Sequence, residues 1–212
     1  MLRIPIPKPK GEQQRTSDLL LDILNEGDAD RLTIGELIDR LGDRAFGVLI
    51  LLCALPNCIP GPPGLSTVTG LPIVVFSLQL LLGNSRPWLP EFLRRRDFSR
   101  EDSLRMVKRA EPWIRKLERL SRPRLSLLVD GMAERFAGLM LFVLSFILIL
   151  PIPLGNLFPA IAIAVIAIAL MEHDGVAIIV GYVWGTISIV IALTAVVVVL
   201  AVIGEFLSRI FG

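Results

Sequence analysis

The chain has 212 residues, 53% of them hydrophobic, and its mean hydropathy of +0.67 is too apolar for a water-soluble domain of this length. Its formal net charge of +2 conceals an uneven distribution, since no Asp, Glu, Lys or Arg occurs in 45–85, 136–171 or 175–204. Three uncharged tracts of this length predict an all-α integral membrane protein rather than one soluble core.

Residues 1–43 are expected to form a cytoplasmic arm with two short amphipathic helices. The basic start lacks the apolar core of a secretory signal peptide, so insertion would rely on the internal hydrophobic tracts. Apolar residues recur at helical spacing from Leu19 to Leu24, and Thr33 followed by Glu36 predicts a second helix that opens with a capping box. Both helices are expected on the membrane surface or against the charged middle of the chain.

Residues 44–85 form the first of two predicted membrane repeats. A helix over 45–58 would be about 21 Å long, which is short of a hydrocarbon core of about 30 Å. The prolines and glycines that follow cannot continue a helix, and a second helix is predicted over 65–83. Because Arg44 precedes this tract and Arg86 follows it, both ends are expected in the cytoplasm, which makes the repeat a re-entrant or barely spanning hairpin.

Residues 86–134 form a charged segment whose pattern predicts helices in the cytoplasm or at the membrane interface. Of the 22 Lys and Arg residues, fourteen lie between 86 and 135, seven precede residue 45 and only Arg209 follows. The simplest interpretation is a solvated linker with interfacial Trp88 and Trp113, and attraction of its arginines to anionic headgroups is compatible with it. Interleaved acidic residues disfavour nucleic-acid binding.

Residues 135–174 repeat the plan of the first membrane segment, and 175–212 are expected to hold a C-terminal transmembrane helix. The uncharged part of that last segment has 30 residues, enough for one tilted span, with Tyr182 and Trp184 in an interfacial belt near its start.

Two topologies remain open for the second repeat. If it is a hairpin, the polar trio Glu172, His173 and Asp174 faces the cytoplasm and the C-terminus ends outside. If it crosses once as a broken span, the trio lies outside and Arg209 returns to the cytoplasm. An inverted pair of repeats, as in many transporters, is disfavoured because it would place either Arg44 or the basic block from Arg86 to Arg135 outside.

The two membrane repeats share a sparse motif, R-x2-G-x12-P-x-P-x-G, in copies 91 residues apart. An acid precedes each motif arginine, as Asp43 and Glu134. Helix-breaking residues at matching depths of two hydrophobic segments are a strong pointer to a binding site in a membrane protein. The first copy comprises Arg44, Gly47, Pro60, Pro62 and Gly64, and the second comprises Arg135, Gly138, Pro151, Pro153 and Gly155.

The stretches LPNCIPGPPGLST and ILPIPLGNLFPA, with the GDRAFG lead-in to the first, resemble the exopolysaccharide synthesis ExoD family of bacterial inner-membrane proteins. The resemblance covers nearly the whole chain from about residue 17 onward. It implies a multi-pass protein of the inner membrane with a role associated with exopolysaccharide production, and with alkaline tolerance in some members. It implies no established reaction and no catalytic residues.

A polar pocket built from both proline-glycine loops is the sharpest functional prediction. Irregular backbone at membrane depth must be covered by protein or line a water-filled cavity, so the loops should face each other or a partner chain. Helices that begin at Leu65 and Leu157 would present uncapped amides, which suit an anion or a polar headgroup. In the alternative interpretation the loops only turn the chain, and Ser66, Thr67 and Asn156 are ordinary N-caps. The predicted pocket residues are Asn57, Pro60, Gly61, Pro62, Gly64, Ser66, Thr67, Pro151, Pro153, Gly155 and Asn156.

Other polar side chains have both a functional and an ordinary interpretation. Arg44 and Arg135 could guard the pocket as a symmetric pair or simply reach phosphate headgroups. Glu172 and His173 could bind a proton, since an imidazole ordinarily titrates near neutral pH, or could belong to a polar turn. Hydrogen bonds between helices are expected for the polar residues inside the tracts, namely Gln79, Ser77, Ser145, Ser188 and Thr194.

Nothing in the chain points to an enzyme, a metal centre or a cofactor. No Ser-His constellation is recognisable around the single histidine, no nucleotide-binding glycine pattern occurs, and Cys53 and Cys58 are expected to pack as small apolar residues. We expect a transporter or channel-like protein for a small ion or anionic solute, embedded in the bilayer as a homodimer because few helices remain to shield two loops. The alternatives are a non-transporting accessory that docks polysaccharide-synthesis enzymes and, less favoured, movement of lipid between leaflets.

Overall fold

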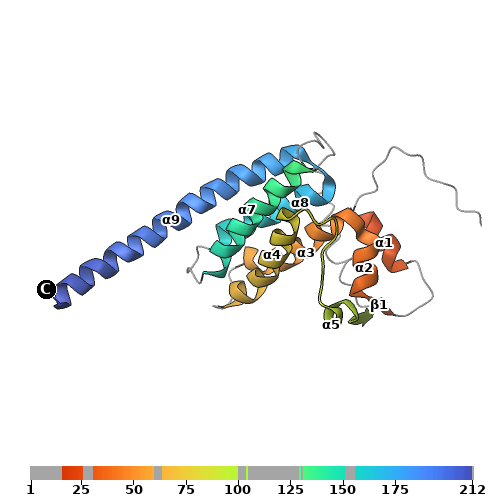
Figure 1. The fold of residues 1–212 in the computed structure, drawn as a ribbon, viewed down its shortest axis with the longest axis horizontal. Coiled ribbons are helices and arrows are strands. Elements are labelled where there is room, and N and C mark those ends of the chain that lie inside the picture. Colours follow the sequence, from red (N-terminus) through yellow and green to blue (C-terminus); the bar gives the residue numbers. More distant parts are fainter. Residues whose placement is uncertain are drawn as a thin grey trace, which may run out of the picture.

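The computed structural model describes residues 16–25, 31–59, 64–99, 104, 129, 131–150 and 156–211. Three of its helical stretches are long and apolar enough to cross a membrane, namely Ile34–Cys58, Met132–Ile149 and Gly175–Val198. The predicted character of a helical membrane protein is therefore supported. Figure 1 shows a bundle of helices, with a small unit at one end and one long helix that extends past the other.

Four helices form the bundle: α3 (Ala45–Ala54), α4 (Leu65–Leu81), α7 (Met132–Ile149) and α8 (Leu157–Glu172). They pack crosswise between the two halves of the chain, α4 against α7 and α3 against α8, and each half also keeps its own two helices in contact. The outer faces remain apolar and exposed, which suits hydrocarbon as the surrounding solvent. Fully buried core side chains come from all four helices: Phe46, Ile50, Ile73, Leu80, Leu141, Leu144, Leu148, Ile163 and Ile166.

Proline and glycine set the helix ends in this bundle. α3 passes into a short 3-10 turn, η2 (Leu55–Cys58), whose proline has no amide hydrogen to continue an α-helix. α4 begins directly after Gly64 and ends just before Gly83, and their φ values of +92° and +83° are conformations that favour glycine. The predicted helix starts at Leu65 and Leu157 are both confirmed.

A small unit of helices and strands lies at one end of the bundle, beside the start of α3 (Figure 1). It comprises α1 (Thr16–Asn25), β1 (Arg31–Thr33), α2 (Ile34–Leu41), α5 (Glu91–Arg94) and β2 (Asp97–Ser99). β1 and β2 pair antiparallel, with Leu32 opposite Phe98. The all-α prediction is wrong here, because strands of three residues are too short to show an alternating pattern in the sequence.

The predicted capping box at the start of α2 is confirmed. Thr33 Oγ1 accepts a hydrogen bond from the Glu36 amide at 3.2 Å, and Glu36 Oε2 accepts one from the Thr33 amide at 3.0 Å. Most of the charged segment 86–134, Trp113 included, lies outside the described residues, and its part from 86 to 99 holds α5 and β2.

The last helix, α9 (Gly175–Phe211), has 37 residues and is about 56 Å long at 1.5 Å per residue. The first turns of α9 pack against the bundle at two glycines. A Cβ added at Gly181 would come within 2.5 Å of Ile166 in α8, and one at Gly185 within 3.3 Å of Met140 in α7. Small residues at such positions allow close helix approach in membranes. Beyond them α9 leaves the bundle, as Figure 1 shows.

Candidate functional site

The starts of α4 and α8, which follow the two proline-glycine segments in the chain, meet through polar side chains. Asn156 Nδ2 donates a hydrogen bond of 2.8 Å to Ser66 Oγ, which joins residues from the two halves of the chain. Thr67 Oγ1 donates a second one, of 3.2 Å, to the carbonyl of Ile149 at the end of α7. Ser66 is only 8% exposed. The contact therefore lies inside the protein, where hydrogen bonds are costly to leave unmade.

Neither helix start is capped by a side chain. Gly64 precedes α4 and has no side chain, and Asn156 precedes α8 but directs its amide to Ser66 instead of the helix. Ser66 lies inside α4, so the interpretation of these residues as ordinary N-caps does not describe the geometry. The first amides of both helices are therefore left to other partners, and such helix ends carry partial positive charge.

Asn156 has spare capacity for a ligand. Its Oδ1 is buried and accepts no hydrogen bond from the described residues. A buried carbonyl oxygen without a donor costs about 1–3 kcal/mol, so a donor from a ligand or a bound water would stabilise it. This oxygen lies on the residue that directly precedes α8, beside Ser66 of α4.

Asn57 plays a different part from Asn156. It is only 7% exposed, and its Nδ2 donates to Thr69 Oγ1 at 2.7 Å and to the Cys53 carbonyl at 3.1 Å. These bonds tie η2 to α4 within one half of the chain. The remaining predicted pocket residues Pro60, Gly61, Pro62, Pro151, Pro153 and Gly155 lie outside the described residues.

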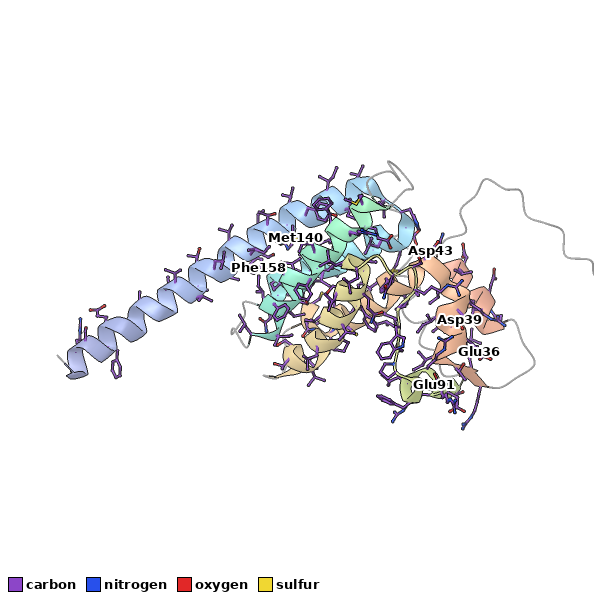
Figure 2. The ribbon with its side chains drawn as sticks, viewed as in Figure 1. Glu36, Asp39, Asp43, Glu91, Met140 and Phe158 are labelled. Atoms are coloured by element: carbon purple, nitrogen blue, oxygen red, sulfur yellow. The ribbon has the colours of Figure 1, made fainter. Side chains whose placement is uncertain are left out.

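A cavity of about 150 Å³ lies at the opposite end of the bundle, where α4 and α8 end and α3 and α7 begin. Two carboxylates line it, Asp43 before α3 and Glu134 in α7, together with His173 after α8. Figure 2 places Asp43 at the end of the bundle that adjoins the small unit. The other lining residues are Phe46, Leu80, Gly83, Ser85, Val129 and Leu170.

The two motif arginines flank this end of the bundle rather than the loops. The guanidinium of Arg135 lies against Gly83, with Nη2 2.7 Å from where a Cβ would be, and Arg44 is half-buried at the start of α3. Of the predicted proton-binding pair, His173 lines the cavity and Glu172 ends α8. His173 adopts a left-handed conformation (φ 51°) that closes α8, and Asp174 Oδ1 then caps α9 by accepting from the Val176 amide at 2.9 Å.

Comparison with known proteins decides the family. Residues 16–194 match the family described as "Exopolysaccharide synthesis, ExoD". The chain belongs to the ExoD family. Protein ExoD of Rhizobium meliloti (strain 1021) is 35% identical over 178 residues, which cover 81% of this chain and 74% of that protein. An uncharacterized protein of Synechocystis sp. is 27% identical over 146 residues, 68% of this chain and 69% of that protein. No solved structure matches the chain significantly.

Two motif glycines of this ExoD-family chain, Gly47 and Gly138, lie where helices of the two halves cross. A Cβ at Gly47 in α3 would come within 2.7 Å of the Ala167 carbonyl in α8, and one at Gly138 in α7 within 2.6 Å of the Leu81 amide nitrogen in α4. Each of these two glycines thus allows a helix of one half to approach the backbone of a helix from the other half.

Some polar residues of the tracts were assigned wrongly from the sequence. These residues do not form the predicted hydrogen bonds between helices. A hydroxyl in an apolar helix can instead donate to a backbone carbonyl of the same helix, three or four residues earlier. Such bonds to the same helix are made by Ser77, Ser145, Ser188 and Thr194. Gln79 instead binds the backbone of Trp88, beyond the end of α4.

Tyr182 and Trp184, predicted as an interfacial belt, make specific contacts of α9 with the ExoD-family bundle. The Tyr182 hydroxyl donates to the Ala133 carbonyl at 3.4 Å, and Trp184 Nε1 donates to the Phe158 carbonyl at 3.2 Å. The Trp184 and Phe158 rings also stack, with centroids 6.2 Å apart. Figure 2 shows Phe158 beside α9.

Neither the acidic cavity nor the Gln79 contact was foreseen from the sequence. The cavity had a usable signal, because one acid precedes each motif arginine in the two repeats. The two cysteines are free and half-buried, and Cys58 Sγ lies 3.6 Å from the Ala54 carbonyl.

Proposed function

We propose that this protein transports a small ion or anionic solute across the bacterial inner membrane in support of exopolysaccharide synthesis. The observation that carries the proposal is the Asn156–Ser66 contact, which brings a buried oxygen without a donor beside two uncapped helix starts. Discontinuous helices whose ends supply backbone amides and carbonyls are the usual way in which membrane transporters bind small charged solutes. The function in the family description supplies the biological setting.

The packing of the helices supports two hairpins, α3–α4 and α7–α8, related by approximate two-fold symmetry. Exchanging α3 with α7 and α4 with α8 turns the α3–α8 contact into the α7–α4 contact. The Asn156–Ser66 contact lies at one end of the four helices, and the cavity with its two acids lies at the other. We infer parallel repeats, each with both ends in the cytoplasm, as the positive-inside rule favours.

In this proposal a solute would pass between two polar places on the axis that relates the two hairpins. Asn156 and Ser66 lie at one end of the bundle, while Asp43, Glu134 and His173 lie at the other, which the inferred topology puts in the cytoplasm. The uncapped starts of α4 and α8 favour negative charge at the first place, whereas the carboxylates of Asp43 and Glu134 favour positive charge at the second. The layers of buried apolar side chains between them would have to separate during transport.

A homodimer would shelter the apolar surface that one chain leaves uncovered. Large side chains along α9 are exposed on the isolated chain, among them Val190, Leu193 and Val197. Lipid covers part of such a surface in a bilayer, and a second copy would cover the loops as well.

Flux through purified protein in liposomes tests the function. We expect flux of at least one of H⁺, Na⁺, K⁺, chloride or phosphate, reduced about ten-fold or more by Asn156→Ala, which removes two polar atoms from the loop contact. Asn57→Ala is expected to reduce it by loosening η2. Ser145→Ala is the control, since among the described residues this fully buried hydroxyl bonds only its own helix, and its flux should stay unchanged.

Absence of flux for every ion tested, from protein that is folded by circular dichroism, would refute transport. Loss of polymer production with Asn156→Ala in cells, combined with that absence, would favour the accessory role instead. Scrambling of fluorescent lipid in the same liposomes would point to movement of lipid between leaflets.

A further inference from the structure

We propose that residues 82–96 form a membrane-binding surface for anionic lipid headgroups. In this surface Gln79 holds the backbone of Trp88 in place beyond the end of α4. The interfacial surface consists of Leu82, Arg86, Trp88, Phe92, Arg95 and Arg96. It is independent of the transport proposal, because it concerns how the chain binds the face of the bilayer and not what crosses it.

The first observation is a double hydrogen bond that the apolar helix α4 makes to the chain beyond its end. Gln79 Oε1 accepts from the Trp88 amide at 2.6 Å, and Gln79 Nε2 donates to the Trp88 carbonyl at 3.1 Å. Gln79 is only 9% exposed, so a buried amide is fully used to hold the backbone of one residue. Both bonds go to the backbone, so the indole ring itself is left free to face outward.

Trp88, which Gln79 holds in this way, is exposed together with other large apolar side chains. Trp88 is 65% exposed, Phe92 in α5 is 69% exposed and Leu82 after α4 is 68% exposed. Tryptophan is enriched at membrane interfaces because its ring is apolar and its N–H is polar. Leu82 continues the exposed apolar surface of α4, so this surface begins where the apolar helix ends.

The segment is anchored to the small unit by one arginine. Arg94 donates to Asp39 Oδ2 at 2.7 Å, and its Cγ lies 2.6 Å from where a Cβ on Gly35 would be. The Ile34 amide donates to the Arg96 carbonyl at 3.0 Å. Figure 2 shows Asp39 and Glu91 together in this unit, apart from the bundle. α5 is therefore held against α2 from one side.

The arginines beside Arg94 supply the charge for headgroups. The side chain of Arg95 is 78% exposed and pairs with Glu91, four residues earlier, at 2.7 Å, while Arg96 is exposed. Arg86 is 63% exposed and 4.0 Å from Asp39. Exposed cations next to exposed aromatic rings at the end of an apolar helix fit an anionic lipid surface, since each group meets a matching layer of the interface.

Fluorescence of Trp88 in lipid nanodiscs tests the proposal. In a chain with Trp113→Phe and Trp184→Phe, we expect lipids brominated in the acyl chain to quench Trp88 more than aqueous iodide does. Gln79→Leu should at least halve quenching by brominated lipid and increase quenching by iodide. Ser77→Ala is the matched control, because this buried hydroxyl bonds only its own helix, and should leave both unchanged.

Varying the lipid composition tests whether anionic headgroups bind the exposed arginines. With Arg95→Glu and Arg96→Glu together, quenching by brominated lipid should fall in discs that contain phosphatidylglycerol and stay unchanged in discs of phosphatidylcholine alone. If the single-tryptophan chain does not fold, Trp88→Phe in the otherwise intact chain should lower the lipid-quenched share of the total emission. Stronger quenching by iodide in both kinds of disc would show a water-facing surface and overturn the proposal. Shielding of Trp88 from both quenchers would overturn it in favour of a protein partner.

Discussion

Gly47 and Gly138 are the motif residues whose role is most sharply defined at the scale of single residues. They are 91 residues apart, and each lies in van der Waals reach of a helix backbone from the other half of the chain. A side chain of any size would push the crossing helices apart. The repetition of the motif thus has a packing cause that holds whether or not the loops bind a solute.

Gly138→Ala should lower the stability of the detergent-solubilised protein by about 1–3 kcal/mol, because the added methyl group meets the Leu81 backbone and not a movable side chain. Gly47→Ala should act in the same direction. Loss of helical circular dichroism on heating measures both. Gly204→Ala, in an exposed part of α9 with nothing within 4 Å of the new methyl group, is the matched control and should be neutral or slightly stabilising. Equal melting temperatures for all three variants would contradict the crossing.

Single residues differ in how far the sequence foretold them. Asn156 was predicted as a pocket residue from its place beside the second proline-glycine motif; its Nδ2 donates to Ser66, while its Oδ1 accepts no hydrogen bond from the described residues. Gln79 was identified as needing a partner but assigned the wrong one, because the sequence does not say that the chain folds back over the end of α4. The need of a polar group is local, whereas its partner depends on the tertiary fold.

At the scale of elements, helix ends were the most predictable feature. Gly64 and the prolines before it act on their immediate neighbours, so the start of α4 at Leu65 followed from the sequence. The sheet of β1 and β2 could not be foreseen in the same way. Its two strands have three residues each, and the pairing of Leu32 with Phe98 joins segments on either side of the first membrane repeat.

The pairing of β1 with β2 is expected to weaken in acid. The Arg31 guanidinium, hydrogen-bonded to Asp97 at 2.7 Å, lowers the pKa of that carboxyl and adds a favourable charge interaction. A lowered pKa in the folded state means that this contribution is complete above the ordinary carboxyl pKa of about 4 and is lost as the pH falls through the lowered value. Both side chains are exposed, so the effect on stability is small.

Hydrogen exchange of the Ile34 amide, which donates to the Arg96 carbonyl beside the strands, reports on this pairing. Its protection in the natural chain should fall toward that of Asp97→Asn as the pH drops below about 4, once the intrinsic pH dependence of exchange is corrected. Arg31→Ala should give the lower protection already at neutral pH. A constant difference between the natural chain and Asp97→Asn across the acid range would count against the ion pair.

At the scale of the whole molecule, the sequence predicted two similar halves but not how they face each other. A repeated motif is compatible with parallel or inverted halves, and charge counting left the hairpin and the broken span open for the second half. Packing of α3 on α8 and of α4 on α7 depends on side chains far apart in the chain. Because Glu134 and His173 line one cavity, the beginning and the end of the second half lie at the same end of the bundle.

Cysteine labelling in intact and permeabilised cells can test the resulting topology. In a background with Cys53→Ser and Cys58→Ser, cysteines introduced at Ser85 and at His173 should both react only from the cytoplasm, since both residues line the cavity. A cysteine introduced at Gly212 should react from outside, because α9 starts at the cavity end and its 37 residues, about 56 Å of helix, exceed a hydrocarbon core of about 30 Å. Reaction at His173 from outside would establish the broken span, separate His173 from Asp43 and Glu134 across the membrane and remove the cytoplasmic end of the proposed path.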